Sequence, residues 1–181
     1  ATPRKNPLPP AQRRAPGPLV WRWQHLLWAP HRLGFFLAVL LLLATGLWWA
    51  LVQWDRLGLG LAWPLAQSPT LTHAAAMTFG FMPLFFAGFL FTAGPKWLGV
   101  PGPPARALLA PLLLQALGWL GWLLGSHWQA GAAQASAVVA WLGLGWMYAL
   151  FAQLVWRSTA ADRIHAKAVV AGGAMGVLSL A

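Results

Sequence analysis

Long apolar runs alternate with short polar gaps along most of this chain. The runs cover residues 33–54, 73–94, 105–127, 132–156 and 164–181, and the gaps are rich in Pro, Gly and charged residues. A bilayer core about 30 Å thick needs about 20 apolar residues of α-helix. The pattern therefore predicts an all-α fold, a polytopic transmembrane helix bundle. Residues 33–181 form its membrane domain, and the fifth span is truncated at Ala181.

The N-terminal region lacks long apolar runs. Residues 1–20 combine prolines with Arg and Lys, which predicts a flexible basic tail. Residues 21–32 interleave tryptophan with Arg and His, a mixture suited to the headgroup layer, so we expect an interfacial segment there. Such a mixture can also bind single-stranded nucleic acid, but a membrane span follows directly and we expect no nucleic-acid partner. That span is too long and contains too much tryptophan for a typical signal peptide, which favours an uncleaved helix.

Composition agrees with lipid as the solvent of this chain. Hydrophobic residues make up 59% and charged residues 8% of the sequence, and the mean hydropathy is +0.61. The chain contains no cysteine, which excludes disulfides, thiolate-bound clusters and covalent haem attachment within it. The sequence begins at Ala1 rather than Met and stops inside an apolar run. We therefore expect a fragment of a longer protein, with the lipid bilayer and the remaining helices of that protein as partners.

The basic residues alternate between successive gaps. Six precede the first span, and the later ones are Arg56, then Lys96 and Arg106, then none in residues 127–131, then Arg157, Arg163 and Lys167. Lys and Arg are enriched in the cytoplasmic loops of membrane proteins. The alternation predicts a cytoplasmic N-terminus, with the 55–72 and 127–131 loops on the outer side.

Two further patterns concern helix packing. Gly121 and Gly125, and likewise Gly172 and Gly176, are spaced so that small residues share one helix face, which favours close helix contacts in lipid. In the second span, Pro83 removes the amide donor of the carbonyl one turn earlier, near Phe79, and predicts a kink. Gly94 and Pro95 are expected to end that span.

Histidines are the main candidates for chemistry, because the first four spans contain no acidic or basic residue in their interiors. His73 opens the second span, and Met77 lies one turn further on the same face. Imidazole and thioether together suit haem iron or copper(I), although methionine also serves in ordinary packing. His165 opens the fifth span, where it either binds a propionate-bearing or anionic group or lies in the interface. No catalytic residue is predicted.

A histidine that ligates haem iron usually places its second ring nitrogen against a hydrogen-bond acceptor. We therefore expect such an acceptor near His73. The other histidines, His25, His31 and His127, lie at span ends and are expected to act as interfacial anchors.

Three segments resemble the NnrS family. These are HAAAMTFGF at residues 73–81, AGFLFTAGPKWLG at residues 87–99 and PHRLGFFL at residues 30–37. They are similar to the family patterns W-H-x-H-E-M-x-F-G-F, A-G-F-L-L-T-A-x-P-N-W-x-G and R-P-F-F-L. The resemblance implies a longer polytopic protein of the bacterial inner membrane that contains non-covalent haem, with copper as an additional candidate. It also implies a role in nitric oxide metabolism or resistance to nitrosative stress.

Residue by residue, His73 matches the first histidine of the family pattern and Met77 matches its methionine. Thr72, Ala75 and Ala76 stand where the pattern has tryptophan, a second histidine and glutamate. If those residues complete a metal site in relatives, this chain binds one metal fewer or none. The alternative function is a non-metal membrane permease or a structural membrane subunit, in which His73 caps a span at the interface.

Overall fold

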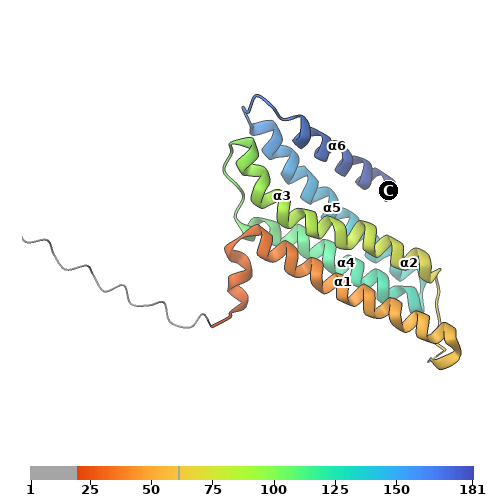
Figure 1. Cartoon of the computed structure of the whole chain (residues 1–181). Helices are drawn as coiled ribbons and strands as arrows, with labels where there is room; N and C mark the ends of the chain where they lie inside the picture. Colours follow the sequence, from red (N-terminus) through yellow and green to blue (C-terminus); the bar gives the residue numbers. More distant parts are fainter. Residues whose placement is uncertain (1–19, 61) are drawn as a thin grey trace, which may run out of the picture.

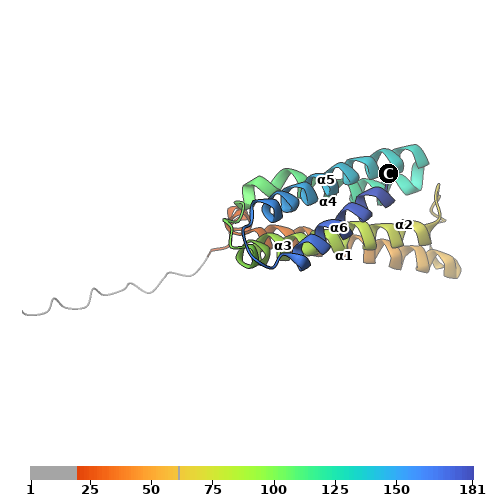
Figure 2. The ribbon, with the colours of Figure 1, turned by 90° about the horizontal axis from the view of Figure 1, so that it is seen from above.

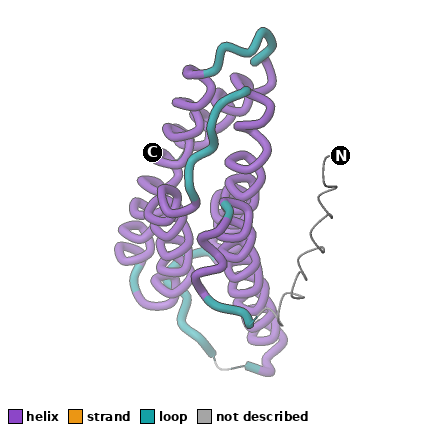
Figure 3. Tube along the Cα trace, turned by 90° about the vertical axis from the view of Figure 1, so that its left-hand side faces the viewer, coloured by secondary structure: helices purple, strands orange, loops and turns teal. Residues whose placement is uncertain are grey.

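The computed structural model describes residues 20–60 and 62–181, so most of the predicted basic tail lies outside the described residues. The described residues form helices and loops with no strand (Figure 3). In chain order the helices are η1 (Trp23–Trp28), α1 (Pro30–Trp54), η2 (Asp55–Leu59), α2 (Pro69–Ala75), η3 (Ala76–Phe81), α3 (Met82–Leu98), η4 (Ala105–Leu108), α4 (Leu109–Trp128), α5 (Ala130–Arg157) and α6 (Ile164–Ser179). Of the short segments, η1 and η4 are 3₁₀-helical, whereas η2 and η3 are π-helical.

Four helical stretches are long and apolar enough to cross a membrane. They run over Pro30–Gly58, Pro69–Leu98, Ala105–Trp128 and Ala130–Arg157. The all-α prediction is confirmed, and the protein is a multi-pass membrane protein. Helix α6 has 16 residues and is shorter than these spans.

Successive spans run in opposite directions, so the connections alternate between the two ends of the bundle (Figure 1). One end, which we call the basic end, holds the start of α1, the α3–η4 connection and the α5–α6 connection. The Lys and Arg residues of those connections therefore gather there, as the alternation predicted. The opposite end holds η2, the start of α2 and the α4–α5 turn. That the basic end faces the cytoplasm stays a prediction.

Several helix boundaries differ from those predicted. Helix α1 begins at Pro30, so His31 lies in its first turn. The second span begins at Pro69, because the hydroxyl of Ser68 caps that helix. His73 consequently lies one turn inside the span. The span also continues through Pro95 to Leu98 and ends where Gly99 adopts a left-handed backbone conformation.

Helices α1 and α3 cross closely near the basic end. A Cβ atom on Gly34 would lie 2.6 Å from Cα of Gly88, so glycine is required at this contact. The Thr92 hydroxyl accepts a hydrogen bond from the backbone N–H of His31 at 3.1 Å and donates one to the Gly88 carbonyl at 2.8 Å. Helix α1 has no side-chain cap of its own, because its N-cap residue is Ala29. Two of the segments that resemble the family pattern, residues 30–37 and 87–99, thus pack against each other.

Helices α4 and α5 form a second closely packed pair, and Figure 2 shows them as one layer beside the layer of α1 and α3. A Cβ atom on Gly121 would lie 2.6 Å from Oγ of Ser136, and one on Gly125 would lie 2.6 Å from the amide nitrogen of Ala133. The packing role predicted for Gly121 and Gly125 is confirmed.

The corresponding prediction for Gly172 and Gly176 is not met by any contact among the described residues. Nothing lies within 4 Å of a Cβ atom placed on either residue. Gly173 makes the close contact instead, against the ring of Tyr148 on α5. Sequence spacing indicates which residues permit close approach, but the rotation of α6 decides which of them meets a neighbour.

Candidate functional site

His73 lies on α2 with its ring against α1. The ring is half-buried and stacks on the indole of Trp49, with 4.6 Å between ring centroids and 21° between ring planes. The guanidinium of Arg56 lies 5.5 Å from the centroid of the same indole. Trp49 of α1 thus orients the His73 ring, and Arg56 of η2 places a cation nearby. Sequence reasoning missed both contacts.

The His73 ring makes no hydrogen bond with the described residues. Its Nδ1 atom is buried and has no partner. The acceptor expected for its second nitrogen is therefore not provided by the described part of the chain. Leaving a buried polar group without a partner costs roughly 1–3 kcal/mol, so such an atom points to a further partner such as a ligand or a water.

Met77 follows His73 in the π-helical segment η3 and is also half-buried. The backbone N–H of Met82 bonds to the Met77 carbonyl, five residues earlier, which is the π-helical pattern. The described residues contain no group of three His, Cys, Asp or Glu side chains that could hold a metal ion. This part of the chain supplies one imidazole and one thioether and no complete set of metal ligands.

The departure from α-helical geometry lies where Pro83 predicted it. Pro83 cannot donate to the carbonyl of Phe79, and the side chain of Gln115 on α4 donates to that carbonyl instead. Gln115 is fully buried. In the sequence, Gln115 is an isolated amide within an apolar run, and no other feature indicated that it would bond to the Phe79 carbonyl.

Other polar atoms between α1, η3 and α4 lack partners. Besides His73 Nδ1, the buried side-chain atoms without a hydrogen bond in the described part are Thr45 Oγ1, Gln115 Oε1 and Trp119 Nε1. Trp119 packs against Gly80 of η3, where an added Cβ atom would lie 2.9 Å from Cγ of the indole. Buried polar groups without partners therefore occur on α1 and α4 as well as at His73.

His165 is exposed in the first turn of α6, beside Trp97 and Asp162 at the basic end of the bundle. Trp97 lies on the same continuous helix as His73 but about 36 Å further along its axis, at about 1.5 Å per residue. The structure therefore does not bring His73 and His165 together. The two histidines cannot ligate the same metal ion.

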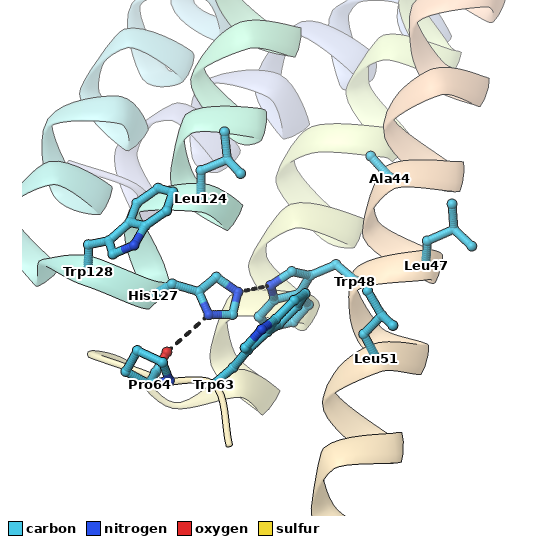
Figure 4. Close-up of a pocket in the computed structure, with 9 residues that line it drawn as sticks. All are labelled: Ala44, Leu47, Trp48, Leu51, Trp63, Pro64, Leu124, His127 and Trp128. Carbon is cyan, nitrogen blue, oxygen red and sulfur yellow. Dashed lines mark hydrogen bonds between the residues drawn. The ribbon is translucent and has the colours of Figure 1, made fainter. Parts of the chain in front are cut away.

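His127 illustrates a histidine with both ring nitrogens engaged (Figure 4). Trp48 Nε1 donates to His127 Nε2 at 2.7 Å, and His127 Nδ1 lies 3.0 Å from the Pro64 carbonyl oxygen. Because Nε2 accepts from the indole, Nδ1 carries the proton and donates to Pro64. These residues line a cavity of about 510 Å³ between α1 and α4. His127 joins α1, α4 and the 60–68 loop, and it has no free nitrogen for a metal.

Comparison with protein families places most of the chain in one family. Residues 25–181 match the family model described as NnrS protein. The chain belongs to the NnrS family. No curated protein and no solved structure matches it. In this NnrS family protein the matched range includes α1 to α6, so it contains both the Gly34–Gly88 helix crossing and the unpartnered His73.

Proposed function

We propose that this NnrS family protein binds haem non-covalently through His73 and acts in nitric oxide metabolism or in resistance to nitrosative stress. The observation that carries the proposal is the unpartnered, buried Nδ1 atom of His73. Among the site residues predicted from the sequence, His73 combines a partly buried ring with an orphaned nitrogen. His165 is exposed, so only His73 is proposed as the iron ligand.

The surroundings of His73 suit an axial ligand of haem iron. A histidine binds iron through a nitrogen lone pair in the ring plane, so stacking of Trp49 on the ring face does not occupy either nitrogen lone pair. Stacking also restricts rotation of the imidazole. Arg56, held against Trp49, supplies a cation that could pair with a carboxylate substituent of the bound group. Bound haem iron would supply a coordination position for a diatomic ligand such as nitric oxide.

Met77 and His165 have secondary roles in the proposed site. The Met77 thioether is a soft donor next to His73, which suits iron or copper(I). Alanine stands at positions 75 and 76, so the positions of the family's second histidine and glutamate offer no side-chain donor atom. A copper site would therefore need ligands from outside the described residues. His165, at the opposite end, would contact anionic groups and not the iron.

The proposed cellular location is the bacterial inner membrane with the N-terminus in the cytoplasm. The support is the gathering of Lys and Arg residues at one end of the bundle, together with family membership. His73 then lies near the outer face of the membrane.

Spectroscopy and metal analysis of the purified full-length protein test the proposal. We expect a Soret band, stoichiometric haem, and nitric oxide binding seen as a shift of that band. Purified protein that carries neither haem nor copper would favour the alternative, a non-metal permease or a structural membrane subunit. The observation that favours this alternative is the pair of alanines at positions 75 and 76.

A further inference from the structure

Helix α6 packs against α5, with several of its apolar side chains partly buried against the hydrophobic core. Gly173 is the only buried residue of this helix, and it packs against Tyr148 on α5. A groove of about 430 Å³ lies between α5 and α6 near the basic end. Its rim carries Arg163, Lys167 and Trp156, and its walls carry Val170, Ala171 and Ala174.

The rim of the groove is cationic. Arg163 is fixed by hydrogen bonds from Nη1 to the carbonyls of Val155, at 3.3 Å, and Ser158, at 2.7 Å. Lys167 lies one turn further along α6 and is exposed. Asp162 lines a neighbouring pocket, where its Oδ1 accepts from the Ile164 amide at 2.9 Å. Both cations therefore lack a carboxylate partner among the described residues.

The groove changes character along the membrane normal. Trp156 is 71% exposed at the last turn of α5, the position where tryptophans mark the headgroup layer. Ala171 and Ala174 lie one to two turns deeper along α6 than Lys167, and their small side chains leave the apolar part of the groove open. A cationic rim above an apolar channel matches the two ends of one amphipathic molecule.

We propose that this groove binds an anionic phospholipid of the leaflet at the basic end. The lipid phosphate lies against Lys167 and the free nitrogens of Arg163, and one acyl chain lies along Ala171 and Ala174. Charge complementarity selects the occupant, because basic pockets between membrane helices attract anionic headgroups. The lipid fills the groove between α5 and α6. The proposal does not depend on haem binding.

Native mass spectrometry of the full-length protein in a non-ionic detergent tests this site by titration with phosphatidylglycerol and phosphatidylcholine. We expect tighter binding of phosphatidylglycerol. Lys167→Gln should weaken it about fivefold, the equivalent of the ~1 kcal/mol that one Lys contributes near an anionic surface. Ala171→Leu, which fills the apolar channel, should weaken both lipids. Lys96→Gln removes an exposed cation from the same end of the bundle outside the groove and should leave binding unchanged.

Several outcomes would overturn the proposal. Equal binding of the two lipids would remove the headgroup preference. Equal losses of lipid affinity in Lys167→Gln and Lys96→Gln would show that the lipid is attracted by general surface charge and not by this groove. Displacement of phosphatidylglycerol by inorganic phosphate at equal concentration would identify a site for free anions, and no effect of Ala171→Leu would indicate that no acyl chain enters the groove.

Discussion

The side-chain amide of Gln115 donates a hydrogen bond to the backbone carbonyl of Phe79, the carbonyl that Pro83 deprives of its helical donor. The proline and the glutamine lie on different spans, and one supplies the partner that the other removes. Helix-breaking residues are tolerated in membranes only where neighbouring groups satisfy the freed backbone. This contact therefore stabilises the π-helical segment that follows His73.

Gln115→Leu should destabilise the protein because it leaves the Phe79 carbonyl unpartnered. We expect a loss of roughly 1–2 kcal/mol in the free energy of unfolding, within the range of side-chain hydrogen bonds in membrane proteins. In a Pro83→Ala background the loss should shrink, since the substituted alanine restores the backbone donor. Unfolding of the wild type, the two single variants and the double variant in mixed detergent micelles measures the coupling between Pro83 and Gln115. Equal losses in both backgrounds would contradict the account, and Gln134→Leu, at an exposed position, is the control.

The crossing of α1 and α3 should be intolerant of a single methyl group. Gly34→Ala places Cβ 2.6 Å from Cα of Gly88, and overpacking of this kind costs about 1–3 kcal/mol. Gly46→Ala adds the same atom on the same helix where nothing lies within 4 Å. We expect a lower melting temperature for Gly34→Ala and an unchanged or higher one for Gly46→Ala. Similar melting temperatures for both variants would argue against close packing at Gly34.

The hydroxyl of Thr92 should act as the N-cap of α1 from a different helix. Thr92→Val keeps the side-chain shape but removes the acceptor for His31 N–H, and loss of a cap costs about 0.5–2 kcal/mol. Thr92→Ser should retain most of the stability because it keeps the hydroxyl. Thr78→Val, at an exposed position, controls for the added methyl group. Thermal unfolding in which Thr92→Val matches Thr78→Val would reject this capping role.

The spans and their alternation could be predicted from the sequence because lipid imposes them locally. Apolar length fixes where a helix can cross, and the three spans between Arg56 and Lys167 place these two residues at opposite ends of the bundle. The predicted helix ends were less accurate. Gly94 and Pro95 predicted the end of the second span, yet the helix continues to Leu98 and ends where Gly99 adopts a left-handed backbone conformation.

The surroundings of the candidate site could not be predicted, because they depend on the rotation of one helix against another. Nothing in the sequence near His73 indicates that Trp49 stacks on its ring. Likewise, the spacing of Gly172 and Gly176 predicted a contact, but α6 is rotated so that Gly173 makes it. The family pattern located His73, whereas only the structure distinguishes its unpartnered ring from the fully bonded ring of His127.

The predicted orientation can be measured with single cysteines, since the chain contains none of its own. Gln129→Cys lies in the α4–α5 turn, and Thr159→Cys lies in the α5–α6 connection at the basic end; both positions are exposed. In intact cells we expect a membrane-impermeant maleimide to label the Gln129→Cys protein, and the Thr159→Cys protein to react only after permeabilisation. Any further cysteines of the full-length protein are first replaced by serine. The reverse labelling pattern would place the N-terminus outside.

The most direct test of haem ligation by His73 is chemical rescue of the full-length protein. His73→Gly should lose the Soret band of the purified protein, and added imidazole should restore it by entering the space that the ring leaves. His165→Gly, at the opposite end, should keep the wild-type spectrum without imidazole. A His73→Gly protein that retains the wild-type Soret band before imidazole is added would contradict the assignment of His73 as the ligand.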